Sequence, residues 1–158
     1  MIDLRGKLPV HPTMKYPPRP LEAIKWVVLH HTAGPSTETP EEIAAYHVNV
    51  RGWPGIAYHY LVGPDGQQYK CWDATTKTNC VAFGNTVSLC VCLVGNFDLG
   101  PVPDAQWNSA VELARLLMDA YEITSVYGHH EAPTSPPQNT NCPGLHFIID
   151  RFRKEVGP

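Results

Sequence analysis

The sequence predicts a single α/β domain in which helices flank a central mixed β-sheet. Apolar runs of strand length alternate with helical patterns, a tight turn joins two of the expected strands, and no internal repeat divides the chain. With 158 residues, 43% of them hydrophobic, the chain has the size of one ordinary domain.

Five segments are expected to form strands. The run IKWVVLHH at 24–31 is rich in β-branched residues and suits a buried strand. The segments at 57–62 and 67–72 flank the turn sequence GPDG and predict an antiparallel hairpin. The apolar run at 87–95 suits the interior of the sheet, and ITSVYGHH at 123–130 predicts one more short strand.

Three helices are expected between and after these strands. The sequence TPEE contains a capping box and a proline at the first helical position, so it predicts a helix over about 40–50. Residues 104–121 place apolar side chains three and four positions apart, which predicts the longest helix. The residues after Pro143 predict an amphipathic terminal helix.

The N-terminal segment, residues 1–23, is expected to be a proline-rich, mildly basic arm wrapped on the domain formed by residues 24–158. Five of the 16 prolines lie within residues 8–20, which favours an extended chain. Its basic residues are Arg5, Lys7, Lys15 and Arg19.

Charge and hydropathy exclude several classes of function. The formal net charge is −3, so no general affinity for nucleic acid is expected. No apolar run reaches the roughly 20 residues that a membrane-spanning helix needs, so no membrane insertion is expected. The start of the chain has no apolar core of a signal peptide, which predicts synthesis in the cytoplasm of the producing cell.

The five cysteines are an odd number, so at least one is a free thiol, a ligand or an intermolecular partner. Cys90 and Cys92 point to one face of the expected strand and are interpreted as small core residues. Cys71 and Cys80 flank an irregular segment, and a disulfide between them is the alternative to two free thiols.

Two histidine pairs end two of the expected strands. Adjacent strand residues point to opposite faces, so one member of His30–His31 and one of His129–His130 can face a shared site. Cys142 follows 13 residues after His129. Two histidines and a cysteine, with a fourth position left for water, are typical of catalytic zinc. Structural histidines without a metal are the alternative explanation.

Five motifs occur in order along the chain. They are VVLHHTAG at 27–34, GWPGIAYHYLVGPDG at 52–66, VSLCVCLVGNF at 87–97, YGHHEAP at 127–133 and TNCPG at 140–144. With these motifs the sequence resembles the type 2 N-acetylmuramoyl-L-alanine amidases over roughly residues 24–150. That family includes phage endolysins and animal peptidoglycan recognition proteins.

The resemblance implies a zinc-dependent catalytic domain at 24–158 that cleaves peptidoglycan between the lactyl group of N-acetylmuramic acid and L-alanine. It implies one zinc ion per chain, held by His30, His129 and Cys142. Tyr58 corresponds to the family's tyrosine beside the metal and would stabilise the oxyanion. Thr140 corresponds to a polar residue before the cysteine and would position water or substrate.

Three further side chains are candidates for contact with substrate. Trp53 and Tyr60 are expected to line a groove for sugar or peptide, with plain packing as the alternative. His47, on the expected helix, is interpreted as a groove residue and not as a ligand. The position of Cys92 carries a glutamate in many bacterial relatives, so the general base is not assigned.

A phage lysis enzyme is the expected biological context. It would be a monomer made without a signal peptide and would act on the cell wall after release, with peptidoglycan as its partner. The alternatives are a non-catalytic peptidoglycan-binding module, against which Cys142 argues, a regulator of RNA polymerase, and a zinc peptidase.

Overall fold

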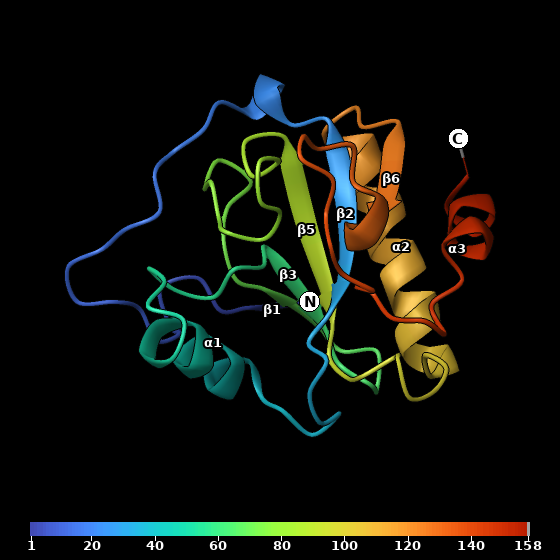
Figure 1. Ribbon diagram of the computed structural model, residues 1–158, viewed down its shortest axis with the longest axis horizontal. Helices are drawn as coiled ribbons and strands as arrows, with labels where there is room; N and C mark the ends of the chain where they lie inside the picture. The colour runs from blue at the N-terminus through green and yellow to red at the C-terminus, as the bar shows by residue number, and fades with distance from the viewer. Residues whose placement is uncertain (158) are drawn as a thin grey trace.

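The computed structural model describes residues 1–157 and shows one domain built on a six-stranded mixed sheet (Figure 1). The strand order is β1-β4-β3-β5-β2-β6; the β3–β4 pair is antiparallel and the other neighbouring pairs are parallel. The strands are β1 (Ile2–Asp3), β2 (Trp26–His31), β3 (Tyr60–Val62), β4 (Gln68–Lys70), β5 (Ser88–Leu93) and β6 (Ser125–Gly128). The helices are α1 (Pro40–Asn49), α2 (Asp104–Ala120) and α3 (Ile149–Val156), with 3-10 turns η1 (Leu21–Ala23) and η2 (His129–Glu131). The predicted fold class is confirmed.

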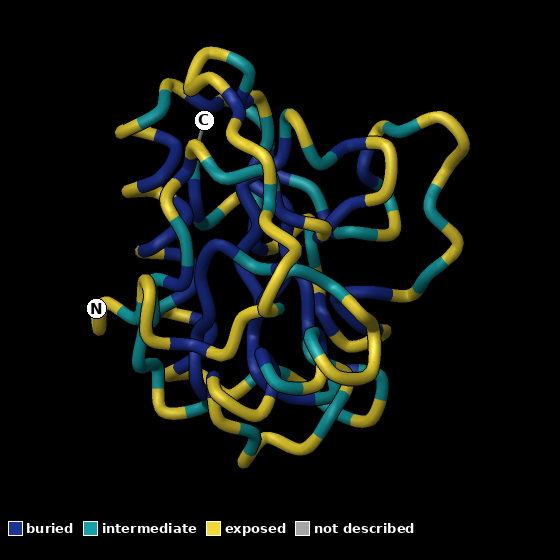
Figure 2. Tube along the Cα trace, turned by 90° about the vertical axis from the view of Figure 1, so that its left-hand side faces the viewer, coloured by how far each residue is buried: buried dark blue, intermediate teal, exposed yellow. Residues whose placement is uncertain are grey.

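The two faces of the sheet are covered by different helices. Figure 1 shows α1 on one side of the sheet and α2 with α3 on the other. On β5, Leu89, Val91 and Leu93 belong to the main core with α2 and α3, whereas Cys90 and Cys92 belong to clusters on the opposite face. Figure 2 shows the buried segments gathered in the centre of the molecule and the exposed segments on its outer loops. No helix within residues 1–157 has both the length and the apolar character needed to cross a membrane.

The predicted capping box at the start of α1 is present. The Thr39 hydroxyl accepts a hydrogen bond from the Glu42 amide at 3.2 Å, and the Glu42 carboxylate accepts one from the Thr39 amide at 2.9 Å. Ile43 and Ala44 of this helix pack against Leu61 in the second core cluster. The local cap therefore begins the helix where its apolar side can cover the sheet.

The ends of two predicted elements differ from expectation. The strand predicted at 123–130 ends at Gly128, and His129 and His130 lie in the turn η2. The terminal helix begins only at Ile149, because the chain after Pro143 first forms turns. The short strand matters for function, because η2 and not strand alternation sets the direction of the second histidine pair.

The N-terminal arm adds an edge strand to the sheet. Strand β1 pairs in parallel with β4, and the Leu4 amide donates to the Lys70 carbonyl at 2.9 Å. Arg5 forms ion pairs with Asp3 and Asp73. These exposed pairs contribute little stability by themselves, but the strand pairing places the start of the arm against the domain.

Arg19 anchors the other end of the arm in the interior. Its side chain is 4% exposed, and its guanidinium donates to carbonyl oxygens of the two segments that precede β5 and of β5 itself. The acceptors are Ala74 at 2.7 Å, Asn85 at 2.8 Å, Thr86 at 3.1 Å and Ser88 at 2.6 Å. Burial lowers the pKa of Arg19 to about 10, so the group keeps its charge at neutral pH. The arm's basic residues are thus not all free for an external partner.

Arg19→Met is expected to lower the free energy of unfolding by about 2–4 kcal/mol, because it leaves several buried carbonyls without a charged donor. Chemical denaturation measures this change. Lys15→Met, at an exposed position of the same arm, is the matched control and should change stability by about 0.5 kcal/mol or less. Equal effects of the two substitutions would show that Arg19 is not an anchor.

The structure contains a disulfide between residues that the sequence analysis did not pair. Cys80 is bonded to Cys90, with a Cα–Cα distance of 6.5 Å, and Cys71 is a free buried thiol. The alternative of a Cys71–Cys80 disulfide is therefore wrong, and the interpretation of Cys90 as only a small core residue is also wrong. Cys90 and Cys92 do lie on the same face of the sheet, opposite the main core, and Cys90 packs there with Cys80.

Candidate metal centre and its cavity

Three side chains with metal-binding atoms converge at one edge of the sheet. His30 comes from β2, His129 from η2 and Cys142 from the loop before α3. Their ligand atoms all lie within 4.8 Å of one another. The Cys142 Sγ lies 3.6 Å from the His30 Nδ1, and the two imidazole centroids are 4.6 Å apart. The structure thus brings together the three ligands expected from the sequence.

The parallel register of β2 and β6 explains why the two histidines meet. Leu29 is the partner of Gly128, so His30 and His129 follow neighbouring positions on adjacent strands. Parallel strands end at the same edge of a sheet, and side chains that follow them gather there. His30 points to the face that carries Cys92, its partner on β5.

The neighbouring histidines hold the structure around this group. His31 lies on the other face, where its Nδ1 accepts a hydrogen bond from the Phe97 amide at 3.1 Å. The His130 amide donates to the Cys142 carbonyl at 2.8 Å, and its Nδ1 lies 3.0 Å from the same oxygen. These contacts give His31 and His130 a supporting role beside the three candidate ligands.

The loop that carries Cys142 is fixed by short-range hydrogen bonds. The Cys142 amide donates to the Thr140 hydroxyl at 3.1 Å, and the His31 amide donates to the Cys142 sulfur at 3.4 Å. Gly144 has φ 116°, and a Cβ there would lie 2.6 Å from the backbone carbon of Phe97. The glycine of the CPG motif is therefore required by both conformation and space.

The electrostatics of the three ligands suit a bound cation. Burial lowers the pKa of His30 well below its usual value, and burial also lowers the pKa of His129. Both rings are neutral at pH 7 and offer a lone pair. Burial raises the pKa of the Cys142 thiol to about 12, and the His31 amide opposes that rise. A metal cation displaces the thiol proton, so the donor set fits zinc.

A cavity of about 510 Å³ opens over the three ligands. Besides the ligands, its lining includes Arg51, Trp53, Tyr58, Asn79, Gln138 and Thr140. The Arg51 guanidinium lies over the Trp53 ring, 4.9 Å from its centroid. A wall with an aromatic ring, a cation and several amides and hydroxyls can contact both a sugar and a peptide.

Tyr58 stands between this cavity and a smaller one. Its ring centroid is 5.3 Å from that of His30 and 5.4 Å from that of His47. The smaller cavity, about 360 Å³, is also lined by Tyr58, together with Glu38 and Tyr46. Burial raises the pKa of Tyr58 well above its usual value, so the hydroxyl stays protonated and can donate a hydrogen bond.

Cys92 is fully buried behind Tyr58. Burial raises the pKa of its thiol well above the usual value, so it stays protonated at neutral pH. A protonated thiol cannot accept a proton from water, so Cys92 does not replace the glutamate of bacterial relatives as a base.

Two of the three substrate-contact candidates are placed differently from expectation. Tyr60 is 3% exposed and lies in the main core on the α2 face, so it cannot line the cavity. Adjacent positions on β3 point to opposite faces, and Tyr60 has the same parity as the core residue Val62. His47 is buried, and its Nδ1 accepts the Ala57 amide at 3.1 Å. Its ring packs against the rings of Trp53 and Tyr58, and it also lines the smaller cavity.

Sequence reasoning missed several side chains at the cavity, among them Gln138, Arg51 and Cys80. The Gln138 amide oxygen lies 3.2 Å from the His129 Nε2, and the Gln138 amide nitrogen donates a hydrogen bond to the Ala82 carbonyl at 2.8 Å. Arg51 lines the cavity next to Trp53, and the disulfide-bonded Cys80 also lines it. Arg51 stands beside the GWPG motif, which could have indicated it. Gln138 lies in a proline-rich loop with no local pattern.

Comparison with known proteins agrees with this arrangement. The sequence profile of the family described as N-acetylmuramoyl-L-alanine amidase matches residues 20–145. The structure is similar to the Ph2119 endolysin from the Thermus scotoductus MAT2119 bacteriophage, with a TM-score of 0.78, 35% identity and 92% of each chain covered. It is also similar to the N-acetylmuramoyl-L-alanine amidase LysC from Clostridium intestinale URNW, with a TM-score of 0.78, 26% identity and coverage of 95% and 97%.

An animal relative matches as well. Peptidoglycan recognition protein 1 from Bos taurus is 30% identical over 152 residues, which covers 83% of this chain and 73% of the relative. The family profile extends over most of the chain and includes His30, Tyr58, His129 and Cys142. The chain therefore belongs to the N-acetylmuramoyl-L-alanine amidase family.

Proposed function

We propose that this protein is a zinc-dependent amidase that hydrolyses peptidoglycan between the lactyl group of N-acetylmuramic acid and L-alanine. One observation carries the proposal: two neutral histidines and a cysteine place their ligand atoms within 4.8 Å of one another at a cavity of substrate size. Three ligands leave a coordination position open, which is the arrangement of catalytic zinc sites.

His30, His129 and Cys142 would hold one zinc ion per chain. When bound, zinc supplies a Lewis acid that activates water near neutral pH. The protonated Tyr58 hydroxyl donates a hydrogen bond to the oxygen of the reacting carbonyl as negative charge develops there. The Thr140 hydroxyl, already an acceptor for the Cys142 amide, can direct its own proton toward water or substrate. Trp53 with Arg51 forms the wall that orients the sugar or peptide.

A non-catalytic peptidoglycan-binding module is the second candidate. The similarity to peptidoglycan recognition protein 1 favours binding of peptidoglycan without deciding whether it is cut. The cavity serves either function, but a binding module does not need the His/His/Cys set. Cys142 in that set favours the enzyme.

The similarity to the Ph2119 endolysin supports a role in phage-induced lysis of the host cell. In this role the protein acts as a monomer, is present in the host cytoplasm and reaches the wall after release. The partner is the sugar strand of peptidoglycan with its stem peptide.

Purified protein is expected to contain about one zinc per chain by elemental analysis, with hydrolysis lost in EDTA and restored by added zinc. Digested wall should show new alanine amino ends and no new reducing sugar ends. Hydrolysis by metal-free protein would contradict the zinc mechanism. Binding of wall without new amino ends would identify a binding module, and reducing ends would indicate a glycosidase.

A further inference from the structure

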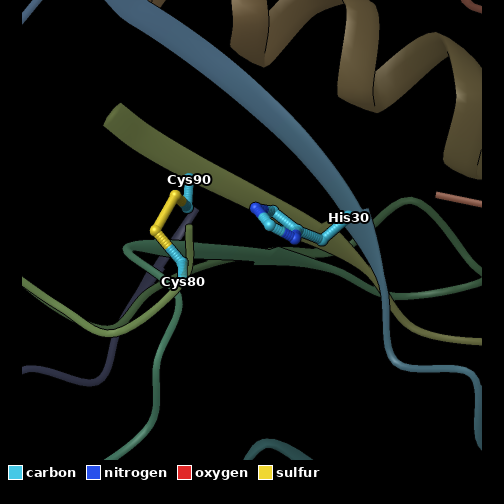
Figure 3. Close-up of side chains that lie close together, drawn as sticks. All are labelled: His30, Cys80 and Cys90. Atoms are coloured by element: carbon cyan, nitrogen blue, oxygen red, sulfur yellow. A yellow bond between two sulfur atoms is a disulfide. The ribbon is translucent and has the colours of Figure 1, made fainter. Parts of the chain in front are cut away.

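A second group of metal-binding atoms adjoins the proposed centre and shares His30 with it. Figure 3 shows the His30 ring pointing toward the Cys80–Cys90 disulfide. One ring nitrogen and the two sulfur atoms lie within 4.8 Å of one another. While the two sulfurs are bonded to each other, neither is a thiolate, and the group cannot hold a metal as two cysteine ligands do.

The His30 ring has one nitrogen that makes no hydrogen bond. The Nδ1 lies 3.6 Å from the Cys142 sulfur, at the proposed catalytic centre. The Nε2 is buried and has no hydrogen-bond partner among the described residues. A buried polar atom without a partner is unfavourable, so a ligand for this nitrogen would stabilise the ring.

We infer that reduction of the Cys80–Cys90 bridge creates a second zinc site from His30 and the two freed thiolates. A dithiol reductant supplies two electrons and two protons, the sulfur–sulfur bond breaks into two thiols, and the reductant becomes a disulfide. Zinc then displaces both thiol protons as it binds the two thiolates. The site is latent while the bridge is intact.

The geometry allows this change without movement of the strands. Zinc–thiolate bonds of about 2.3 Å place two tetrahedral sulfur ligands roughly 3.8 Å apart. The Cα atoms of Cys80 and Cys90 are 6.5 Å apart, so rotation of the side chains can supply the extra separation. The buried Thr78 hydroxyl donates to the Cys80 sulfur at 3.5 Å and would stabilise a thiolate. Cys80 lines the large cavity, which gives a metal ion a path of entry.

The two sites compete for one imidazole. A neutral imidazole has a single nitrogen with a free lone pair, so a metal held by Cys80 and Cys90 withdraws His30 from His129 and Cys142. This consequence rests on the proposed function, because it assumes that the catalytic set holds zinc. The latent site itself requires only His30, Cys80 and Cys90.

Cobalt binding to Cys142→Ser tests the inference, because this variant lacks the thiolate of the catalytic set. The protein is reduced with a dithiol, freed of reductant under anaerobic conditions and titrated with Co²⁺. Reduction is expected to tighten Co²⁺ binding about tenfold or more, since two thiolates become available. The near-ultraviolet absorption from thiolate to Co²⁺ should correspond to two sulfur ligands. No gain on reduction would overturn the inference.

The matched control adds Cys80→Ser and Cys90→Ser to the same variant. It keeps the free thiols Cys71 and Cys92, and its affinity for Co²⁺ should not respond to reduction. An equal gain in this control would assign the metal to those other thiols and overturn the inference. The oxidised parent protein tests the proposed function separately, because its one-thiolate Co²⁺ spectrum depends on Cys142. The latent site and the proposed function can therefore be contradicted independently of each other.

Thiol alkylation shows whether the site forms in folded protein. After reduction, zinc should protect two more thiols of Cys142→Ser from alkylation than it protects in the control, while the far-ultraviolet circular dichroism stays native. Loss of the native spectrum in the presence of zinc would also contradict the inference, because the site needs the native approach of β5 to the preceding loop.

Discussion

With the Cys80–Cys90 bridge intact, Cys142→Ser is expected to lose its bound zinc and to hydrolyse the amide about 10³-fold more slowly, or slower still, while the protein still binds peptidoglycan. A serine hydroxyl stays protonated near neutral pH and is a much weaker zinc ligand than a thiolate. Loss of several kcal/mol of transition-state stabilisation corresponds to a loss of this size. Elemental analysis, release of alanine amino ends and a wall pull-down measure the three properties with the disulfide intact.

Cys71→Ser is the matched control for this prediction. Cys71 is also a buried free cysteine, but it lies in the cluster under α1 and β3 and not in the metal-binding group. The control should retain zinc and hydrolysis even if burial of the hydroxyl lowers its stability. Full activity of Cys142→Ser would remove Cys142 from the metal centre, and loss of wall binding together with metal would show that the loop also forms the binding surface.

Tyr58→Phe is expected to lower turnover by about 10²–10³-fold with zinc content unchanged. The substitution keeps the ring that packs between His30 and His47 and removes only the hydroxyl of this cavity-lining residue. Removal of one donor to an oxyanion typically costs this much in rate. The affinity for uncut peptidoglycan should change much less than the turnover number, because the hydrogen bond strengthens as charge develops.

Tyr60→Phe is the control for Tyr58→Phe. Tyr60 is only two positions further along the chain, but Tyr58 precedes β3 and the two side chains pack on opposite faces of the sheet. Tyr60 lies in the core against α2, and its pKa is raised mainly by burial there. This variant is expected to retain full turnover. A rate loss shared by both variants would indicate a general effect on the sheet, and near-native turnover of Tyr58→Phe would exclude its hydroxyl from catalysis.

The sequence by itself determined the order along the chain of the three helices and of five of the six strands; β1 was not predicted. The β-branched and apolar runs predict β2 and β5, and the capping box predicts the start of α1. These signals are local, because residues a few positions apart decide strand alternation and helix capping. The five motifs also identified the family, and with it the three residues that the structure brings within 4.8 Å of one another.

Tertiary structure decided the properties that depend on residues far apart in the chain. Cys80 pairs with Cys90 and not with Cys71 because β5 lies in the sheet interior and turns Cys90 toward the preceding loop. The sequence shows Arg19 only as one of the basic residues of the arm, but several carbonyl groups from distant segments surround its guanidinium. No local pattern encodes such acceptors, because they meet only when the segments pack.

The same distinction applies within the site. Proximity of His30 and His129 could be expected from two strands that end at one edge, but the turn η2 that aims His129 was not visible in the sequence. Tyr60 was placed at the groove because aromatic residues suit both grooves and cores. The pairing of β3 with β5 decides which face it occupies, and that face is filled by α2. Burial on a particular face is a property of the assembled sheet, whereas the tendency to form the strand belongs to the sequence alone.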